Sequence, residues 1–303
     1  MKNSLLIKTC LFHSGFLAFC RRLSDSGQVP ILRYHAIVDP SANNYASPSI
    51  CLSPGLFEAQ IKFFSKKYTI ISLDDVALCV QQERSFPRNS VVLTFDDGYR
   101  DNYHAYQIMK KYGAHGTFYI AADCIGGGEN LWLFEVIYIV TNTIIQELEL
   151  HVNNQIFRFP LNTLLDRSHA IRKITSIIKS SDIAVREAIR EQLRVQAKDI
   201  KDLNEQSAKI MLTWEQVQEM SDNGMDIGGH TLTHLNLPNA DPKDAEREII
   251  ECKKLIEAKT GKQVNHFSYP NGGDYDYYNN AVIGMVKRAG YLTATTSNNG
   301  LAT

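Results

Sequence analysis

Short runs of apolar and β-branched residues alternate with longer segments of helical periodicity from about residue 30 onward. This alternation is typical of repeated β-α units around a parallel sheet. The pattern therefore predicts an α/β fold, for which a barrel is the natural arrangement. The expected strands cover residues 31–35, 69–73, 91–95, 116–121, 225–230, 266–270 and 291–297.

Helices are expected between these strands. The segment SPGLFEAQIKFFSKK starts with Ser53 as N-cap and Pro54 in the first turn, and its apolar residues recur at helical spacing. The segment DPKDAEREIIECKKLIEAKTGK has an apolar stripe and ends at Gly261, a residue suited to a helix C-terminus. Both stripes are expected to face the core.

The alternation is interrupted between about residues 126 and 212. Here LELHVNNQIFRFPL has alternating residues on both sides of NNQ, which indicates a β-hairpin. Helical, charge-rich stretches follow from Leu164 to Lys209. We interpret residues 126–212 as a subdomain inserted into a single domain of residues 30–303, and expect it to overhang a binding face.

Residues 1–29 form a separate N-terminal amphipathic segment. Lys8 and His13 interrupt its apolar run, and Arg21 and Arg22 follow it without the small-residue cleavage site of an export signal. The segment is expected to dock on the domain, with association to a membrane surface as the alternative. The chain has no transmembrane span of about 20 uninterrupted apolar residues. Location in the cell envelope or the cytoplasm stays open.

Charge and cysteine content narrow the function classes. The formal net charge of −1 provides no basic excess, so nucleic acid is not an expected partner. The six cysteines are widely spaced without a CxxC pair, which favours buried thiols. Metal binding by thiolates is the less favoured alternative.

Two adjacent carboxylates follow a buried strand in VVLTFDDGY. Asp96 and Asp97 repel each other unless a cation or a proton lies between them. Gly98 allows the backbone to turn away after them. The alternative is a plain strand-to-loop turn in which Asp97 caps a helix.

A histidine pair and a Pro-Gly loop follow two other predicted strands. In HTLTH, His230 and His234 are spaced i, i+4, so on a helical turn they share one face and can bind one metal ion. A histidine pair on the surface is the alternative. The loop YPNGG covers residues 269–273. Because the carboxyl ends of parallel barrel strands meet at one face, the joint occurrence of these motifs favours a functional site there.

In this order, LTFDDGY, HTLTH and FSYPNGG resemble the motifs of polysaccharide deacetylases, also called the NodB homology domain or carbohydrate esterase family 4. The stretches VPILRYHAIV and LTWEQVQEMSDNGMDIGGHT are similar to bacterial members as well. The resemblance covers residues 30–300 apart from the insertion. It implies a distorted (β/α)7 TIM-like barrel of the glycoside hydrolase/deacetylase type.

The resemblance also implies roles for individual residues. Asp97, His230 and His234 would bind a divalent metal, usually zinc, and Asp96 would act as catalytic base. We further expect the backbone N–H of Tyr269 to stabilise an oxyanion. The candidate substrate-binding residues are His35, Tyr99, Pro270 and Asn271.

The activity implied is that of a hydrolase acting on carbon–nitrogen bonds other than peptide bonds, which removes N-acetyl groups from sugars of a polysaccharide or glycan. Two departures qualify this expectation. Ser268 stands where many members have an arginine, and no histidine follows His266, so the general acid is unassigned. A catalytically weak or inactive glycan-binding member is the alternative. A zinc peptidase is less favoured, because HExxH is absent from the sequence. His266 begins its strand, and no role is expected for it.

Overall fold

The computed structural model describes residues 27–272 and 276–298, so most of the N-terminal amphipathic segment lies outside the described residues. A seven-stranded parallel sheet has the order β1-β3-β4-β7-β8-β9, and β2 pairs with the first residues of β3. This confirms the expected α/β fold. Its strands are β1 (Ile31–Tyr34), β2 (Thr69–Ile70), β3 (Ser90–Phe95), β4 (Thr117–Ile120), β7 (Asp226–Gly229), β8 (His266–Ser268) and β9 (Thr293–Thr295).

The sheet curls so that its two edges approach each other. Arg33 in β1 donates a hydrogen bond from Nη1 to the Oγ of Ser297, just beyond β9. The β2 strand is shorter than predicted, because Ser72 begins the next helix by accepting a hydrogen bond from the Asp75 backbone N–H at 2.9 Å. The result is a half-barrel with its strand ends aligned by parallel pairing.

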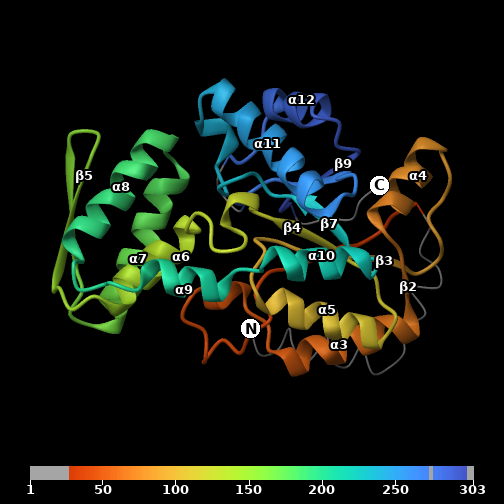
Figure 1. Ribbon diagram of the computed structural model, residues 1–303, viewed down its shortest axis with the longest axis horizontal. Coiled ribbons are helices and arrows are strands. Elements are labelled where there is room, and N and C mark those ends of the chain that lie inside the picture. Colours follow the sequence, from red (N-terminus) through yellow and green to blue (C-terminus); the bar gives the residue numbers. More distant parts are fainter. Residues whose placement is uncertain (1–26, 273–275, 299–303) are drawn as a thin grey trace, which may run out of the picture.

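Helices surround this sheet (Figure 1). In that view α3 and α5 lie below the sheet, and α11 and α12 lie above it. As predicted, α3 begins after Ser53, and α11 ends at Gly261 with a φ of 66°. The helices are α3 (Pro54–Lys67), α4 (Leu73–Gln81), α5 (Asp101–Lys111), α6 (Trp132–Asn142), α7 (Leu164–Lys179), α8 (Ile183–Gln196), α9 (Leu203–Ile210), α10 (Trp214–Asp222), α11 (Pro242–Thr260) and α12 (Asn280–Arg288), with 3-10 turns at Pro48–Ile50, Ala122–Cys124 and Leu237–Asn239.

Aromatic side chains fill the main core between the sheet and its helices. Phe95 and Phe118 stack with ring centroids 4.4 Å apart, and Phe57 and Phe267 are fully buried near them. Each such side chain contributes roughly 1.5–3 kcal/mol by burial. The strands that lead to the candidate site are therefore supported by packing against the surrounding helices.

Residues 132–210 build a second unit, at the left of Figure 1. It contains the antiparallel hairpin of β5 (Glu147–Val152) and β6 (Gln155–Pro160), joined by Asn153 and Asn154 with φ of 50° and 63°. Two residues with positive φ suit the tight turn that the sequence predicts. A separate core forms here from Trp132, Val136, Ile139, Leu148, Leu150, Ile174, Ile178, Ile189 and Leu193.

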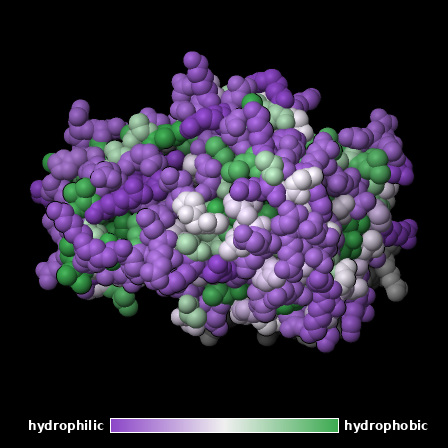
Figure 2. Space-filling model, in the orientation of Figure 1, coloured by the Kyte–Doolittle hydropathy of each residue, from purple (hydrophilic) through white to green (hydrophobic). Residues whose placement is uncertain are grey.

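The face of the molecule seen in Figure 2 is mainly hydrophilic, with separate hydrophobic spots. Among the described residues, no helix is both long and apolar enough to cross a bilayer. The described cysteines Cys79, Cys124 and Cys252 are buried free thiols, as expected, and Cys51 is half-buried.

Candidate active site

The three sequence motifs meet at the carboxyl end of the sheet. Asp96 and Asp97 directly follow β3, His230 directly follows β7, and Ser268 ends β8. Parallel pairing of these strands brings their ends to one edge. The backbone there is unusual, because Asp97 and Asn271 have φ of 78° and 74°. Such conformations cost about 1–3 kcal/mol each and cluster at functional sites.

Asp97, His230 and His234 form a compact buried triad. Asp97 Oδ1 lies 3.4 Å from His230 Nε2 and 3.2 Å from His234 Nε2. Ligand atoms about 2.0–2.1 Å from a tetrahedral zinc ion are separated by about 3.3 Å, so these spacings suit such an ion. The three side chains are the right donors in the right arrangement to hold a divalent metal.

The hydrogen bonding of His230 supports the same interpretation. Its Nδ1 lies 2.8 Å from the carbonyl oxygen of Ser268. A carbonyl only accepts, so Nδ1 donates, and in the neutral ring Nε2 carries the lone pair that faces Asp97. Two acceptors that face each other in a buried site require a cation or a proton between them.

The pKa values follow from burial and from these contacts. Burial alone would raise the pKa of Asp97, but hydrogen bonds to His230 and His234 outweigh it and hold the pKa well below its usual value. Burial lowers the pKa of His230, yet its contact with Asp97 reverses this and the pKa is raised. Burial dominates at His234, so its pKa is lowered. The triad thus favours an ionised carboxylate and a neutral His234.

The histidines do not converge on a helical turn, so that expectation is wrong. Thr231 and His234 have φ of 62° and 56°, which breaks helical geometry. The loop is instead held by polar contacts: Thr231 Oγ1 accepts from the Leu235 backbone N–H at 3.1 Å. The Glu248 carboxylate of α11 accepts from the Thr233 backbone N–H at 2.9 Å and from its hydroxyl at 2.8 Å.

The inserted unit contacts this histidine loop directly. Trp132 Nε1 of α6 donates to the His234 carbonyl at 2.9 Å, and Arg186 Nη2 of α8 donates to Thr233 Oγ1 at 3.1 Å. Asn236 Nδ2 donates to the carbonyl of Lys179 at the end of α7. Burial lowers the pKa of Lys179, and the charge of Asp97 acts against this shift. The α7 terminus therefore lies close to Asp97 and to the histidine loop.

Asp96 has a different environment from Asp97. Its Oδ2 accepts from the Ser268 hydroxyl at 3.4 Å and lies 3.9 Å from both Arg33 Nε and His35 Nε2. Its Oδ1 is buried and has no hydrogen-bond partner among the described residues. One oxygen is thus held and the other is available to a ligand.

Arg33 is a site residue that sequence reasoning missed. It lies two positions before His35, so the period-two alternation of β1 places both side chains on one face. That alternation was the available signal. Arg33 is a cationic neighbour of Asp96, with its Nε 3.9 Å from Oδ2.

Two expected site residues have other partners. The backbone N–H of Tyr269 donates to the Thr295 carbonyl at 3.1 Å, so it is engaged in the sheet and does not support the expected oxyanion role. Tyr99 is 1% exposed and its hydroxyl hydrogen-bonds Asp97, which makes it a support for the triad rather than a substrate contact. Burial raises the pKa of Tyr99 well above its usual value.

The remaining candidates lie at the same edge of the sheet. The side chain of His35 is 19% exposed, next to Asp96. Pro270 and Asn271 follow β8, and both side-chain amide atoms of Asn271 are buried without a hydrogen-bond partner among the described residues. An unsatisfied buried amide is costly, so Asn271 is well suited to bind a polar ligand.

Comparison with known proteins agrees with this arrangement. The family model for polysaccharide deacetylases matches residues 83–133 and 198–294, which excludes most of the inserted unit. Over 277 residues the chain is 24% identical to YxkH of Bacillus subtilis, a protein named provisionally as a polysaccharide deacetylase; the match covers 91% of this chain and 66% of that protein. It is 36% identical over 81 residues to a peptidoglycan-N-acetylglucosamine deacetylase of Bacillus cereus, covering 27% of this chain and 36% of the relative. The chain thus spans less than two thirds of the length of these curated relatives.

Solved structures share the fold. The Streptococcus pyogenes deacetylase PplD, solved with acetate, superposes with a TM-score of 0.58 at 21% identity, covering 91% of this chain and 86% of that one. A polysaccharide deacetylase of Bacillus cereus superposes with a TM-score of 0.55 at 20% identity, covering 91% and 59%. With its motifs aligned at one end of a curled parallel sheet, the chain belongs to the NodB-type polysaccharide deacetylase family.

Proposed function

We propose that the chain is a metal-dependent hydrolase that removes N-acetyl groups from amino sugars of a polysaccharide or glycan. One observation carries the proposal: Asp97, His230 and His234 form a buried triad with metal-ligand spacing, and the adjacent Asp96 keeps one carboxylate oxygen unpaired. The relative named for peptidoglycan N-acetylglucosamine supports an N-acetylated amino sugar as the substrate class.

In this proposal the triad would hold a divalent ion, with zinc the expected species. Such an ion supplies a Lewis acid that polarises the acetamide carbonyl and makes water a stronger nucleophile near neutral pH. The contact between His230 Nδ1 and the Ser268 carbonyl keeps Nε2 directed at the metal position. Glu248, through Thr233, fixes the loop that carries His234.

Asp96 would act as the base. Its Oδ1 accepts the proton of the attacking water, while Ser268, Arg33 and His35 hold Oδ2. The oxygen of that water bonds to the acetyl carbon and the carbon–nitrogen bond breaks. Asp96 then returns the proton to the departing nitrogen, so one residue takes part in both steps. The products are acetate and an amino sugar.

Substrate contacts are proposed for the half-buried His35 and for the loop after β8. The unpartnered amide of Asn271 offers both a donor and an acceptor to a sugar hydroxyl or acetamide. Pro270 restricts the backbone immediately before Asn271. The α7 terminus at Lys179, beside the histidine loop, would border the bound glycan.

The test is acetate release from chitooligosaccharides by the zinc-loaded protein. Asp96→Asn is expected to lower the rate by at least about 100-fold, because general base catalysis is removed, while zinc content stays unchanged. Asp244→Asn removes an equally charged but exposed carboxylate of α11 and serves as the matched control. A wild-type rate in Asp96→Asn would exclude it as the base. Zinc binding without acetate release from any N-acetylated oligosaccharide would favour a glycan-binding protein.

A further inference from the structure

A second cluster of metal-ligating side chains lies at the opposite end of the sheet. Asp226 begins β7, His266 begins β8, and Asp74 lies in the first turn of α4. The strand β7 therefore has Asp226 at its amino end and leads to His230 at its carboxyl end. The two clusters are separated by the length of a strand and share no residue.

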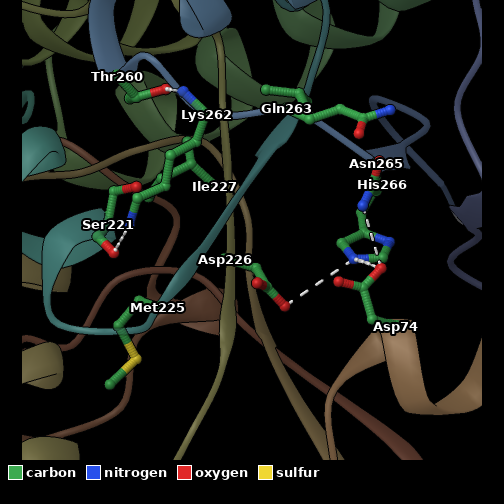
Figure 3. Close-up of a pocket in the computed structure, with 11 residues that line it drawn as sticks. Asp74, Ser221, Met225, Asp226, Ile227, Thr260, Lys262, Gln263, Asn265 and His266 are labelled. Atoms are coloured by element: carbon green, nitrogen blue, oxygen red, sulfur yellow. Dashed lines mark hydrogen bonds and ion pairs between the residues drawn. The ribbon is translucent and has the colours of Figure 1, made fainter.

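The geometry of this amino-end cluster resembles that of the first triad. His266 Nε2 lies 3.3 Å from Asp74 Oδ1 and 3.9 Å from Asp226 Oδ2. Figure 3 shows the imidazole between the two carboxylates, which belong to different elements. One ligand atom from each residue lies within 4.8 Å of the others, and the 3.3 Å between His266 Nε2 and Asp74 Oδ1 matches the separation of about 3.3 Å between ligands of a tetrahedral zinc ion.

His266 has the properties of a ligand rather than of a core residue. It is 2% exposed, and its Nε2 has no hydrogen-bond partner among the described residues although it points at two acids. Its Nδ1 lies 2.9 Å from Thr293 Oγ1, which holds the ring from behind. Anchoring one ring nitrogen and presenting the other is the usual arrangement of metal-binding histidines.

Nearby residues complete the surroundings. His115 Nε2 lies 3.3 Å from Asp226 Oδ2 and so borders that carboxylate. Asn265 Nδ2 donates to Asp74 Oδ1 at 3.2 Å and orients that carboxylate. A cavity of about 60 Å³ adjoins the cluster, and Asp74 is half exposed, so an ion has a path of entry.

Charge in the cluster is only partly balanced by protein groups. Burial lowers the pKa of His266, and this effect is larger than the opposite effect of the Asp226 and Asp74 charges. The ring is therefore favoured in its neutral form, which is the form that binds metals. Lys262 also lines the cavity, but Figure 3 shows its side chain directed at Ser221, where Nζ donates to the backbone carbonyl. Two carboxylates beside a neutral imidazole match the charge of a divalent cation.

We propose that Asp74, Asp226 and His266 bind a divalent transition-metal ion such as Zn²⁺, distinct from the ion of the active site. The ion joins α4 to the amino ends of β7 and β8. Residues at this face of a barrel serve stability rather than catalysis, so the role of the site is structural. The inference does not depend on the proposed deacetylase activity.

Zinc binding to the chelator-treated protein tests the proposal. The parent for this experiment is the full chain with His230→Gln and His234→Gln, which removes the first triad. It is expected to bind one zinc ion per chain by calorimetry, and zinc is expected to raise its melting temperature. Adding Asp74→Asn, a half-exposed position, is expected to weaken zinc binding at least about tenfold and to abolish the melting shift.

Asp222→Asn is the matched control, because it removes one carboxylate near the same end of the sheet without touching the cluster, and it should leave zinc binding unchanged. A folded parent that binds no zinc would overturn the proposal, and so would binding that Asp74→Asn leaves intact. If the double histidine variant does not fold, zinc is counted in the wild-type chain instead. The wild type must then bind two zinc ions per chain, and Asp74→Asn must bind one. Acetate release should persist in Asp74→Asn, so failure of the deacetylase proposal is measured separately.

Discussion

At the scale of single residues, the adjacent carboxylates differ because their partners differ. Asp97 faces two imidazoles, whereas Asp96 faces a hydroxyl, a guanidinium and one more imidazole at longer range. The repulsion between neighbouring acids is thereby offset on both sides. In the proposed mechanism these two adjacent residues have different tasks: Asp97 binds the metal and Asp96 accepts a proton.

Arg33 is expected to position Asp96. Replacing it with glutamine removes the positive charge 3.9 Å from Oδ2 and should lower kcat by roughly 10–100-fold, because the base is no longer held in place. Arg33→Lys should restore part of the rate through charge alone. Acetate release with zinc content measured in parallel checks this, and an unchanged kcat in Arg33→Gln would contradict it.

Zinc binding at the active site should depend on pH through His230. The raised pKa of His230 means that the metal-free triad still holds a proton above the ordinary histidine value of about 6.5. Zinc must displace this proton, so its affinity should rise by up to about tenfold per pH unit until His230 is neutral. The measurement is a calorimetric zinc titration of Asp74→Asn, in which the second proposed zinc site is weakened. Titrations in buffers of different ionisation enthalpy should show the proton release. Absence of any release below pH about 7 would contradict the assignment.

At the scale of elements, β7 depends on two glycines that precede His230. A Cβ at Gly228 would lie 2.4 Å from Tyr119 Cδ1 and 2.9 Å from the His266 carbonyl. The close approach of neighbouring strands therefore requires glycine here. The strand that delivers the first histidine is tightly packed on both of its faces.

Gly228→Ala should destabilise the protein by about 1–3 kcal/mol or more, because the added methyl group has no space. Gly55→Ala is the control, for which we expect a change in stability of the opposite sign. It lies in α3 with no atom within 4 Å of the added Cβ, and alanine there should stabilise by about 0.5–1 kcal/mol. Urea unfolding measures both changes, and equal stabilities would show that the strand relaxes around the methyl group.

The same scale explains which features the sequence could predict. The strands were predictable because their buried runs are apolar, and the Asn153-Asn154 turn because few residues accept positive φ. The conformation of the histidine loop, with positive φ at Thr231 and His234, was not, because its contacts come from distant parts of the chain, such as Glu248 of α11. No role was expected for His266, because its neighbour Asp74 is distant in the chain.

At the scale of the whole molecule, a buried ion network stabilises the inserted unit beside the barrel. Glu135 of α6 is fully buried and accepts from Arg190 Nε at 2.9 Å and from Arg194 Nε at 2.6 Å. Arg190 is itself 5% exposed and also donates to the carbonyl of Asn130. Removing the acid would leave the buried Arg190 guanidinium with Glu187 as its remaining hydrogen-bonded acidic partner, and would leave Arg194 without the Glu135 carboxylate.

Glu135→Ala should therefore cost about 3–5 kcal/mol of stability. Glu149→Ala is the matched control, because Glu149 forms an exposed ion pair with Arg158 within the same unit and its removal should leave stability nearly unchanged. Thermal or denaturant unfolding checks both. If Glu135→Ala changed stability as little as Glu149→Ala, other groups would be shown to compensate the charge of Arg190.

The contacts of Trp132 with the His234 carbonyl and of Arg186 with Thr233 have a consequence for evolution and engineering. The inserted unit holds the loop that carries His234, so a change in this unit can alter the proposed metal site as well as the proposed glycan contacts. Replacing this unit with that of a relative should preserve metal binding when both hydrogen bonds can still form. A replacement that breaks them should weaken metal binding before it changes substrate specificity.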